Sequence, residues 1–216
     1  MTRCYLVRHA QTSWNEENRI QGHSDVPLSP LGEAQAKRLG AFFASRHLKG
    51  IVTSALTRSQ QTAQAIAAGN GHGVQPITER GLAEIHLGAW EGLTPEEVDG
   101  RYQGAYQQWR ARPSTVSIPD AEPLEAFRVR VRRTLEQLIE RFEDGEYVIV
   151  SHGGVIAAML ADTLGADFDL LLRRLRLDNA GITALEFATP LPHVLWINAT
   201  AHLDTLVQPP FGAGWL

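Results

Sequence analysis

The sequence predicts an α/β protein: a three-layer sandwich in which a mostly parallel central sheet is flanked by helices, with a small cap segment in addition. Two observations support this prediction. Apolar, strand-like segments alternate along the chain with segments of helical spacing, which is typical of a parallel sheet with crossover helices. Two predicted strands, YLVRHA (5–10) and YVIVSHG (147–153), are continuous apolar runs, as expected for strands covered on both faces.

The first third of the chain predicts strands and helices in alternation. Ser29 is a good N-cap for the first long helix and Pro30 a good first residue, and Leu31, Leu39 and Phe43 lie on its apolar stripe. The predicted strands are CYLVRHA (4–10), GIVTS (50–54) and VQPITER (74–80), and the predicted helices are residues 29–47 and 55–69.

The rest of the chain begins with an irregular stretch, 82–123, which contains short helical pieces near 94–102 and 106–113. After it, regular alternation returns. The predicted elements are a long helix at 123–142, a strand at 146–152, a helix at 153–165, and two strands at 181–188 and 192–199 with a turn at TPLP between them.

Composition predicts one compact domain over residues 1–216, because the chain is long for one small domain and short for two. A net charge of −4 argues against nucleic acid as a partner, since such binding depends on neutralised phosphates. The single cysteine, Cys4, excludes an intrachain disulfide. With no apparent signal peptide or membrane-spanning segment, we expect a cytoplasmic protein with no membrane contact.

Both fully apolar strands end in a histidine, His9 in the first and His152 in the second. In open α/β sheets, ligands bind beyond the carboxyl ends of the strands. If the two strands are neighbours, His9 and His152 face each other across one crevice. Either histidine alone is more simply a structural residue, and the matched pair favours a site.

Several ordered blocks carry a resemblance to a known family. The blocks are LVRHAQTSWN (6–15), RIQGHSDVPLSPLGEAQA (19–36), VTSALTRSQQTAQAI (52–66), LAEIHLGAWEGL (82–93) and VIVSHGGVIAAML (148–160). Together they resemble the histidine phosphatase superfamily, in the branch of the cofactor-dependent phosphoglycerate mutases, from about Tyr5 to Asn179. The resemblance implies an acid-type histidine phosphatase, that is, a phosphomonoester hydrolase that forms a phosphohistidine on a small phosphorylated metabolite.

The same resemblance implies the roles of individual residues. His9 matches the nucleophile, Glu84 the proton donor, and His152 a second catalytic residue that also holds the phosphate. The candidate substrate-binding residues are Arg8, Asn15, Arg58, Gln21, Gly22 and Gly153. These residue types suit the chemistry, because neutral imidazole is a nucleophile near neutral pH and arginine binds phosphate oxygens in pairs. Glu91 is expected to be peripheral, and the histidines His23 and His86 are weaker candidates, each as consistent with loop structure as with the pocket.

Three positions depart from the family pattern. Ala10 stands where glycine is usual, so we expect an ordinary backbone there with room for the methyl group. Gln11 replaces a common glutamate and removes one negative charge. Pro123 occupies the serine of a Gly-Glu-Ser step in which Glu122 is retained. That step usually shapes the substrate side of the pocket, so specificity inferred from relatives is in doubt there.

The resemblance leaves the acceptor of the phosphoryl group open. Dedicated mutases of the family carry a longer insertion with a basic, proline-rich stretch, which residues 101–123 do not resemble. We therefore expect a phosphatase, with mutase-type phosphoryl transfer as the alternative. The cap segment, about 94–123, has aromatic and cationic residues that suit a phosphorylated metabolite or, equally, a packed lid helix with solvated arginines.

Two other classes compete with a phosphatase. A non-catalytic phosphate-binding protein would keep the pocket without turnover. A metallohydrolase is suggested by eight histidines, but no His-x-His or H-E-x-x-H spacing is present, so we expect no metal and no cofactor. The apolar C-terminal tail, Pro209–Leu216, is expected to fold over the pocket or, alternatively, to form a homodimer contact.

Overall fold

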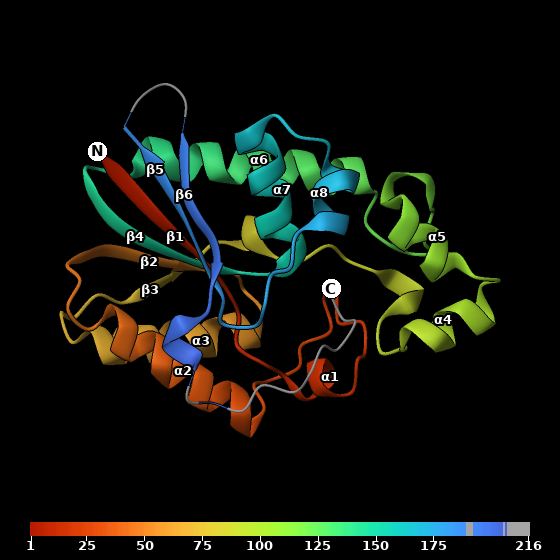
Figure 1. Ribbon diagram of the computed structural model, residues 1–216, viewed down its shortest axis with the longest axis horizontal. Coiled ribbons are helices and arrows are strands. Elements are labelled where there is room, and N and C mark those ends of the chain that lie inside the picture. The colour runs from red at the N-terminus through yellow and green to blue at the C-terminus, as the bar shows by residue number, and fades with distance from the viewer. Residues whose placement is uncertain (189–191, 205, 207–216) are drawn as a thin grey trace.

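The computed structural model describes residues 1–188, 192–204 and 206. In this part of the chain, six strands form one sheet in the order β3-β2-β4-β1-β5-β6 (Figure 1). Strand β1 pairs parallel with β4, and β2 pairs parallel with both β4 and β3. Strands β5 and β6 add an antiparallel edge. The bounds are β1 Thr2–Arg8, β2 Leu48–Thr53, β3 Pro76–Thr78, β4 Gly145–Ser151, β5 Ile182–Phe187 and β6 His193–Ala199.

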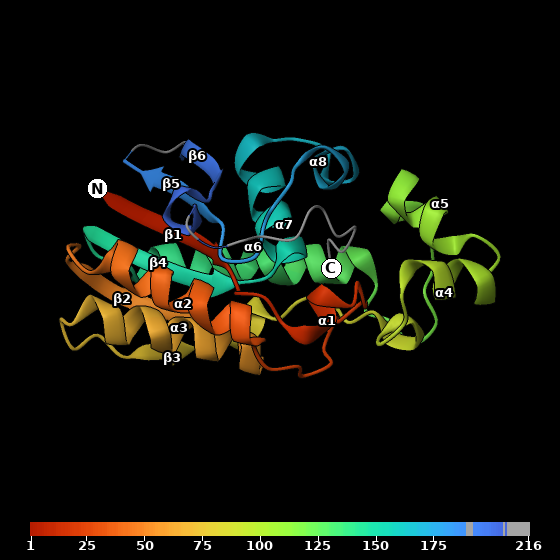
Figure 2. The same ribbon diagram turned by 60° about the horizontal axis from the view of Figure 1, so that its bottom comes forward.

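Helices cover both faces of this sheet, which confirms the predicted three-layer α/β sandwich. Helices α2 (Pro30–Phe43) and α3 (Thr57–Asn70) lie on one face, and α6 (Leu124–Arg141) and α7 (Gly153–Leu164) lie on the other (Figures 1 and 2). A short α8 (Phe168–Arg174) follows α7. Central strands therefore have no solvent-facing side, which explains why they are continuous apolar runs.

Alternate residues of each central strand enter different cores. In β1, Cys4 and Leu6 pack with the α6 and α7 side, whereas Tyr5 and Val7 pack with the α2 and α3 side. All four side chains are fully buried. This is the period-two geometry of a strand. Burial raises the pKa of the Cys4 thiol to about 12, so this cysteine is an inert core residue.

The helix cap predicted at Ser29 is present, since the Ser29 side chain accepts from the Gly32 N–H and Pro30 begins α2. The predicted apolar stripe is wrong in part, because Leu31 is only half-buried. The buried stripe instead includes Gly40, where an added Cβ would lie 2.6 Å from the Ala65 carbonyl oxygen. A glycine lets α2 and α3 approach closely, and a pattern based on apolar residues cannot predict such a contact.

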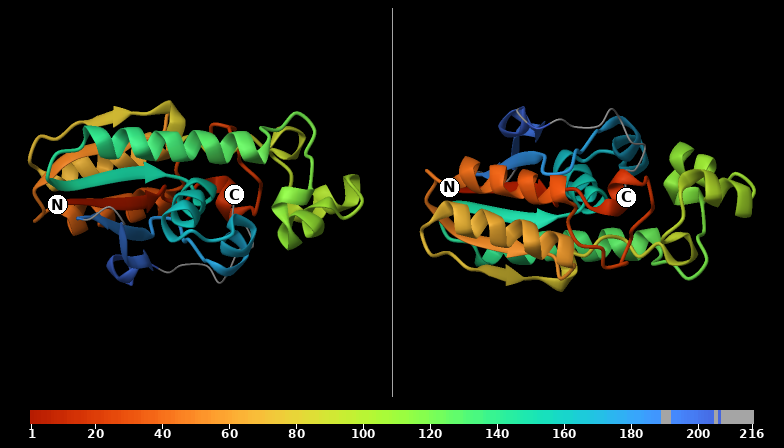
Figure 3. Two further views of the ribbon diagram at one scale, coloured as in Figure 1. Left: turned by 90° about the horizontal axis from the view of Figure 1, so that it is seen from above. Right: turned by 90° about the horizontal axis from the view of Figure 1, so that it is seen from below.

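The cap consists of two short helices, α4 (Pro95–Arg101) and α5 (Ala105–Ala111), followed by a 3₁₀ turn at Pro113–Thr115. It lies beyond the carboxyl ends of β1 and β4, at one end of the molecule (Figures 2 and 3). Both helical pieces fall where the sequence predicts them. Helix α1 (Ser13–Glu16) and α8 are not predicted, because one and two turns of helix are too short for a periodic pattern.

Within the described residues, none of the helices has the length and apolar character needed to cross a membrane. Most of the predicted TPLP turn and most of the C-terminal tail lie outside the described residues.

Candidate active site

The parallel strands β1, β4 and β2 end at the same edge of the sheet. The residues that follow them there are His9, His152 and Ser54. Arg8 is the register partner of Ser151 in the β1–β4 ladder, so His9 and His152 follow at matched positions. Their ring centroids are 5.2 Å apart. Strand β2 ends beside them, because the Ser54 N–H donates to the Val150 carbonyl at 3.0 Å. The two predicted histidines therefore face each other, as expected from their strands.

The hydrogen bond of His9 determines which of its ring nitrogens is available. Its Nδ1 lies 2.8 Å from the Ala10 carbonyl oxygen, which only accepts, so Nδ1 carries the hydrogen. The neutral ring then has its lone pair on Nε2. Burial lowers the pKa of His9 well below its ordinary value, and the charges of Arg58 and Arg8 lower it further. His9 is thus a buried, neutral imidazole with one free nucleophilic nitrogen.

His152 is oriented by a residue that the sequence analysis missed. Its Nε2 lies 2.8 Å from the Ser54 hydroxyl and 3.4 Å from the Ser59 hydroxyl. With Ser54 as the donor to Nε2, the hydrogen of the neutral ring is on Nδ1. Nδ1 is buried and has no hydrogen-bond partner among the described residues. Burial lowers the pKa of His152 well below its ordinary value, as do Arg58, His9 and Arg8.

Arg8 is the last residue of β1 and is only 5% exposed. Its Nη1 donates to the Leu177 carbonyl at 2.6 Å, which holds the guanidinium in place. Its Nε is buried without a hydrogen-bond partner in the part of the chain that the structure describes. Burial lowers the pKa of Arg8, and the nearby carboxylates of Glu84 and Asp178 oppose that shift. The group remains a fixed cation at neutral pH.

Arg58 is in the first turn of α3 and is held by the loop that contains Gly22. Its Nη2 donates to the Gly22 carbonyl at 2.7 Å, and its Nη1 donates to the Ser24 carbonyl at 2.9 Å. Its Nε has no hydrogen-bond partner among the described residues. Burial lowers the pKa of Arg58 to about 10. Asp25 caps the same helix, accepting from the Thr57 N–H and hydroxyl at 2.7 Å.

Gly22 has a structural reason to be glycine. Its φ is +51°, and an added Cβ would lie 2.1 Å from Glu91 Oε1. The Glu91 carboxylate accepts from the backbone N–H groups of His23, Ser24 and Leu87. Glu91 therefore ties the Gly22 loop to the loop after Glu84, which fits the peripheral position expected for it.

Asn15 and Gln21 belong to a network of neutral side chains around α1. Asn15 Oδ1 accepts from the Thr12 N–H at 3.0 Å and from Asn179 Nδ2 at 3.1 Å. Any contact from Asn15 to a ligand would therefore use its Nδ2. Gln21 Oε1 lies 2.9 Å from the Thr12 hydroxyl, and Gln21 is 2% exposed. Asn179, which also donates to the His9 carbonyl, is a further residue that the sequence analysis missed.

Glu84 lies in a buried position beside the start of α7. Its Oε2 accepts from the Gly154 N–H at 3.0 Å, and its Oε1 accepts from the Ile85 N–H at 2.9 Å. Burial raises the pKa of Glu84, while these N–H groups and the charges of Arg58 and Arg8 oppose the rise. Gly153, a candidate substrate-binding residue, is the first residue of α7, but Gly154 makes the contact to Glu84.

The charged and titratable groups of this site are close enough to influence one another's pKa values. The charges of Arg8 and Arg58 act on the pKa values of His9, His152 and Glu84, so all five groups lie within one cluster. Three buried nitrogens in it, Nε of both arginines and Nδ1 of His152, have no hydrogen-bond partner within the described chain. Buried polar atoms are almost always paired, so unpaired donors beside two cations indicate a binding site for a small anion.

The departures from the family pattern have simple structural outcomes. Ala10 has no positive φ, is fully buried and donates its N–H to the Thr62 hydroxyl, as expected for an ordinary backbone. The Gln11 side chain accepts from the Ser29 hydroxyl at 2.8 Å, at the start of α2. Pro123 is the N-cap residue of α6.

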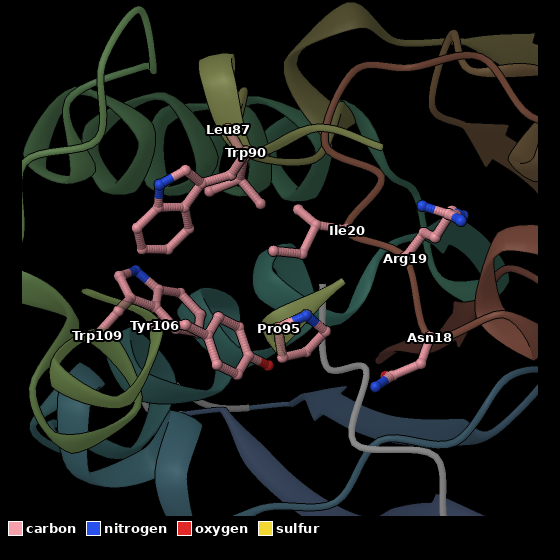
Figure 4. A pocket seen from close by; sticks show the side chains of 8 residues that line it. All are labelled: Asn18, Arg19, Ile20, Leu87, Trp90, Pro95, Tyr106 and Trp109. Atoms are coloured by element: carbon pink, nitrogen blue, oxygen red, sulfur yellow. The ribbon is translucent and has the colours of Figure 1, made fainter. Parts of the chain in front are cut away.

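The cap contributes an apolar core. Figure 4 shows Trp90, Tyr106 and Trp109 converging with Leu87 and Ile20. The space left between them is only about 10 Å³, roughly the size needed for one water molecule. Trp109 and Tyr106 are 5% and 7% exposed. These aromatic residues are thus packed together, in agreement with the simpler of the two interpretations, and Arg110 and Arg112 of the same segment are exposed.

In the described ranges, no group of three or more His, Cys, Asp and Glu side chains is arranged to hold a metal ion. The candidate residues other than Asn15, Gln21 and the glycines are cationic, imidazole or carboxyl groups, and the arginines would repel a cation.

Comparisons with known proteins agree with this geometry. The sequence model of the histidine phosphatase superfamily (branch 1) matches residues 4–200. A probable phosphoglycerate mutase GpmB of Serratia proteamaculans is 34% identical, covering 95% of this chain and 96% of that protein. Phosphoserine phosphatase 1 of Hydrogenobacter thermophilus is 33% identical, covering 94% and 95%.

Among solved structures, YhfR of Bacillus stearothermophilus superposes with a TM-score of 0.87 at 29% identity, over 94% of this chain and 100% of that one. Both the match over most of the chain and the relatives above 30% identity support the same assignment. The protein belongs to the histidine phosphatase superfamily, branch 1.

Proposed function

We propose that this protein is a phosphomonoester hydrolase that acts through a phosphohistidine intermediate on a small phosphorylated metabolite. The observation that carries the proposal is the cluster of two facing neutral imidazoles and two buried arginines, in which three nitrogens have no hydrogen-bond partner among the described residues. At about 4 Å and an effective dielectric constant of 20, each pair of unit charges attracts by roughly 4 kcal/mol before desolvation. Two arginines and several N–H donors together suit a phosphate dianion.

In the first step, Nε2 of His9 attacks phosphorus and the bond from phosphorus to the ester oxygen breaks. The hydrogen on Nδ1 stays on the ring and keeps its hydrogen bond to the Ala10 carbonyl, which stabilises the ring as it gains positive character. Arg8, Arg58 and His152 Nδ1 would hold the equatorial oxygens, where negative charge is spread. Glu84 supplies the proton that the departing alkoxide needs, which its raised pKa favours.

In the second step, water attacks the phosphohistidine. Glu84, now ionised, accepts the proton of that water and returns to its acid form. The phosphoryl group leaves His9 as inorganic phosphate, and His9 regains its lone pair. The two N–H donors at Glu84 stabilise the carboxylate that exists between the two steps.

Hydrolysis is favoured over mutase-type transfer by the cap. Its arginines Arg101, Arg110 and Arg112 are all exposed and its aromatic residues are packed on one another, so its described residues form no buried basic site for a second phosphate. The relatives' names include both a phosphatase and a mutase, so similarity alone does not separate the two reactions. The alternative, a non-catalytic phosphate-binding protein, would not require a proton donor of raised pKa.

An acid-type pH dependence is part of the proposal. His9 keeps its lone pair below the ordinary histidine pKa of about 6.5, and Glu84 keeps its proton above the ordinary glutamate pKa. Both shifts favour activity on the acidic side of neutrality. The buried, single Cys4 is consistent with the reducing cytoplasm that we propose as the location.

The test uses p-nitrophenyl phosphate and rapid quenching. We expect a phosphoryl adduct on His9 by mass spectrometry during turnover, and a fall in kcat/KM of at least about 10⁴-fold in His9→Ala. The exposed Arg133→Lys variant is the control and should match the wild type. Turnover without an adduct on His9 would contradict the proposed intermediate.

A second assay separates the mutase alternative. With 3-phosphoglycerate and catalytic 2,3-bisphosphoglycerate, a phosphatase releases inorganic phosphate, whereas a mutase forms 2-phosphoglycerate. Isomer formation faster than phosphate release would replace hydrolysis with phosphoryl transfer as the function.

A further inference from the structure

Arg130 of α6 makes an unusually complete set of hydrogen bonds to the loop that contains Glu84. Its Nη1 donates to the carbonyl oxygens of Gly81 at 2.9 Å and Ala83 at 2.7 Å, and its Nη2 donates to that of Glu84 at 3.2 Å. The rest of the guanidinium binds the Glu122 carboxylate through Nε at 2.9 Å and Nη2 at 2.7 Å. All five N–H donors of this side chain are thereby used.

Glu122 grips the same loop on the other side of Glu84. Its backbone N–H donates to the His86 carbonyl at 2.9 Å, and its Oε2 lies 3.5 Å from the His86 N–H. Arg130 and Glu122 therefore hold backbone groups both before and after Glu84. Glu122 is the glutamate retained from the family's Gly-Glu-Ser step, and in this structure it pairs with Arg130.

Arg130 and Glu122 together are called the clamp here, and Arg130 belongs to a long, well-packed helix. Helix α6 has 18 residues, and Phe127 and Val131 of its buried face are fully buried. The Arg130 guanidinium lies over the Phe127 ring, 5.2 Å from its centroid. The loop itself has little regular structure, since only short 3₁₀ turns at Arg80–Leu82 and Gly88–Trp90 flank Glu84. Its carbonyl oxygens therefore take partners from side chains, from Arg130 and, at Glu84, also from His23 Nε2 at 2.7 Å.

Position is critical for a proton donor, because misplacement by about 1 Å is enough to remove much of its effect. The hydrogen bonds from Arg130 end on backbone carbonyls and on Glu122, and its side chain is 25% exposed. Arg130 is thus placed to act on the Glu84 carboxyl only through the backbone.

We propose that Arg130 and Glu122 are positioning residues that fix the Glu84 carboxyl at the ester oxygen of the substrate. The proposal rests on the proposed function, in which Glu84 protonates the leaving group. It follows that weakening the clamp should impair proton donation and spare the attack by His9.

Leaving groups of different basicity separate these two effects. p-Nitrophenolate departs near neutral pH without a proton, whereas the alkoxide of glycerol 2-phosphate needs one. In Arg130→Lys, which cannot reach three carbonyls and Glu122 together, we expect kcat/KM for glycerol 2-phosphate to fall about 30-fold and that for p-nitrophenyl phosphate by less than about threefold. Arg133→Lys, an exposed position on the same helix, is the matched control and should change neither value.

A double-mutant cycle gives a second readout. If Arg130 acts through the Glu84 carboxyl, then adding Arg130→Lys to Glu84→Gln should cost less than about threefold on either ester. Glu122→Gln keeps one acceptor for Arg130 and should show the same substrate dependence to a smaller degree. It also serves as the test variant if Arg130→Lys fails to fold in thermal denaturation.

The outcomes are distinguishable. An equal loss on both esters, or additive losses in the cycle, would make the clamp a general structural feature and overturn the proposal. No loss on either ester would overturn it as well. If the wild type hydrolyses neither ester, the proposed function fails first. If the wild type hydrolyses both and only the substrate dependence is missing, the clamp alone is wrong.

Discussion

The phosphate side of the candidate site and the cap differ in how they are built. Around the proposed phosphate position, His9, His152 and Arg8 extend directly from a parallel ladder, and Arg58 is held by two backbone carbonyls. The cap consists of two seven-residue helices outside the sheet, with exposed arginines and with Tyr106 and Trp109 buried in the same core as Trp90. The first region has its geometry imposed by the hydrogen-bonded sheet, whereas the second is held by side-chain packing against neighbouring segments.

This difference suggests a division of labour. The reacting groups must keep their relative positions within a few tenths of an ångström, and strand register provides that accuracy. A segment outside the sheet, such as the cap, can vary without disturbing the ladder, since loops tolerate changes that strands do not. Substitutions on the phosphate side should therefore affect all substrates alike, and substitutions in the cap should affect them selectively.

The largest expected effect tests the phosphate side. In Arg58→Lys, a single ammonium cannot hold two carbonyls and also donate from the Nε position, so we expect kcat/KM for p-nitrophenyl phosphate to fall about 10³-fold. Arg110→Lys, on the exposed face of α5, should stay within about threefold. Steady-state kinetics measure both. A loss below tenfold in Arg58→Lys would mean that Arg58 is not needed in the arrangement seen here.

The sequence predicts the strand ends well because their information is local. A continuous apolar run followed by a histidine occurs twice, and matched strand ends lead directly to the facing imidazoles. The fold class and both cap helices also follow from local patterns. These features depend on neighbouring residues and on one general rule about parallel sheets.

The features missed depend on which distant segments become neighbours. Ser54 contacts His152 only because β2 pairs with β4, which no local pattern reveals. Arg130 reaches the Glu84 loop from a helix whose charges are most simply interpreted as a solvated face. The Gly40 contact between α2 and α3 has no apolar signature at all. Strand order and side-chain reach were therefore the missing information.

A second prediction compares one glycine from each region. Gly22 and Gly104 both have positive φ, but only Gly22 has a neighbour within 4 Å of an added Cβ. Gly104→Ala should cost about 1 kcal/mol of stability from backbone strain and leave activity intact. Gly22→Ala has the same strain plus a clash with Glu91, and it displaces the carbonyl that holds Arg58.

We therefore expect Gly22→Ala to lose about 10- to 100-fold in kcat/KM, as well as more stability than Gly104→Ala. Urea unfolding and kinetics on the same preparations give both quantities. Equal activity in the two variants would show that the Gly22 loop has no special role in placing Arg58.

The smallest expected effect is on the pH dependence of the free energy of unfolding, which reports the protons taken up when the protein unfolds. Burial and nearby arginines lower the pKa of His152 in the folded protein, whereas in the unfolded chain it is about 6.5. Below pH 6.5 the unfolded chain therefore binds more protons at this residue, so the stability of the folded state decreases as pH falls. One such proton corresponds to at most about 1.4 kcal/mol per pH unit.

His152→Asn removes the titrating imidazole and keeps a polar side chain at this position. Between pH 6.5 and 5.5, we expect the free energy of unfolding of the wild type to decrease by about 1 kcal/mol more than that of the variant, measured in urea. His86, in the loop after Glu84, has a side chain that is 40% exposed, and His86→Asn is the control variant. Parallel curves for wild type and His152→Asn would mean that His152 binds protons equally in the folded and unfolded states, so that its surroundings do not hold it neutral. In that case the phosphate side would gain a third cation as pH falls below 6.5, and the electrostatic contrast with the cap would be larger than the buried, neutral imidazole implies.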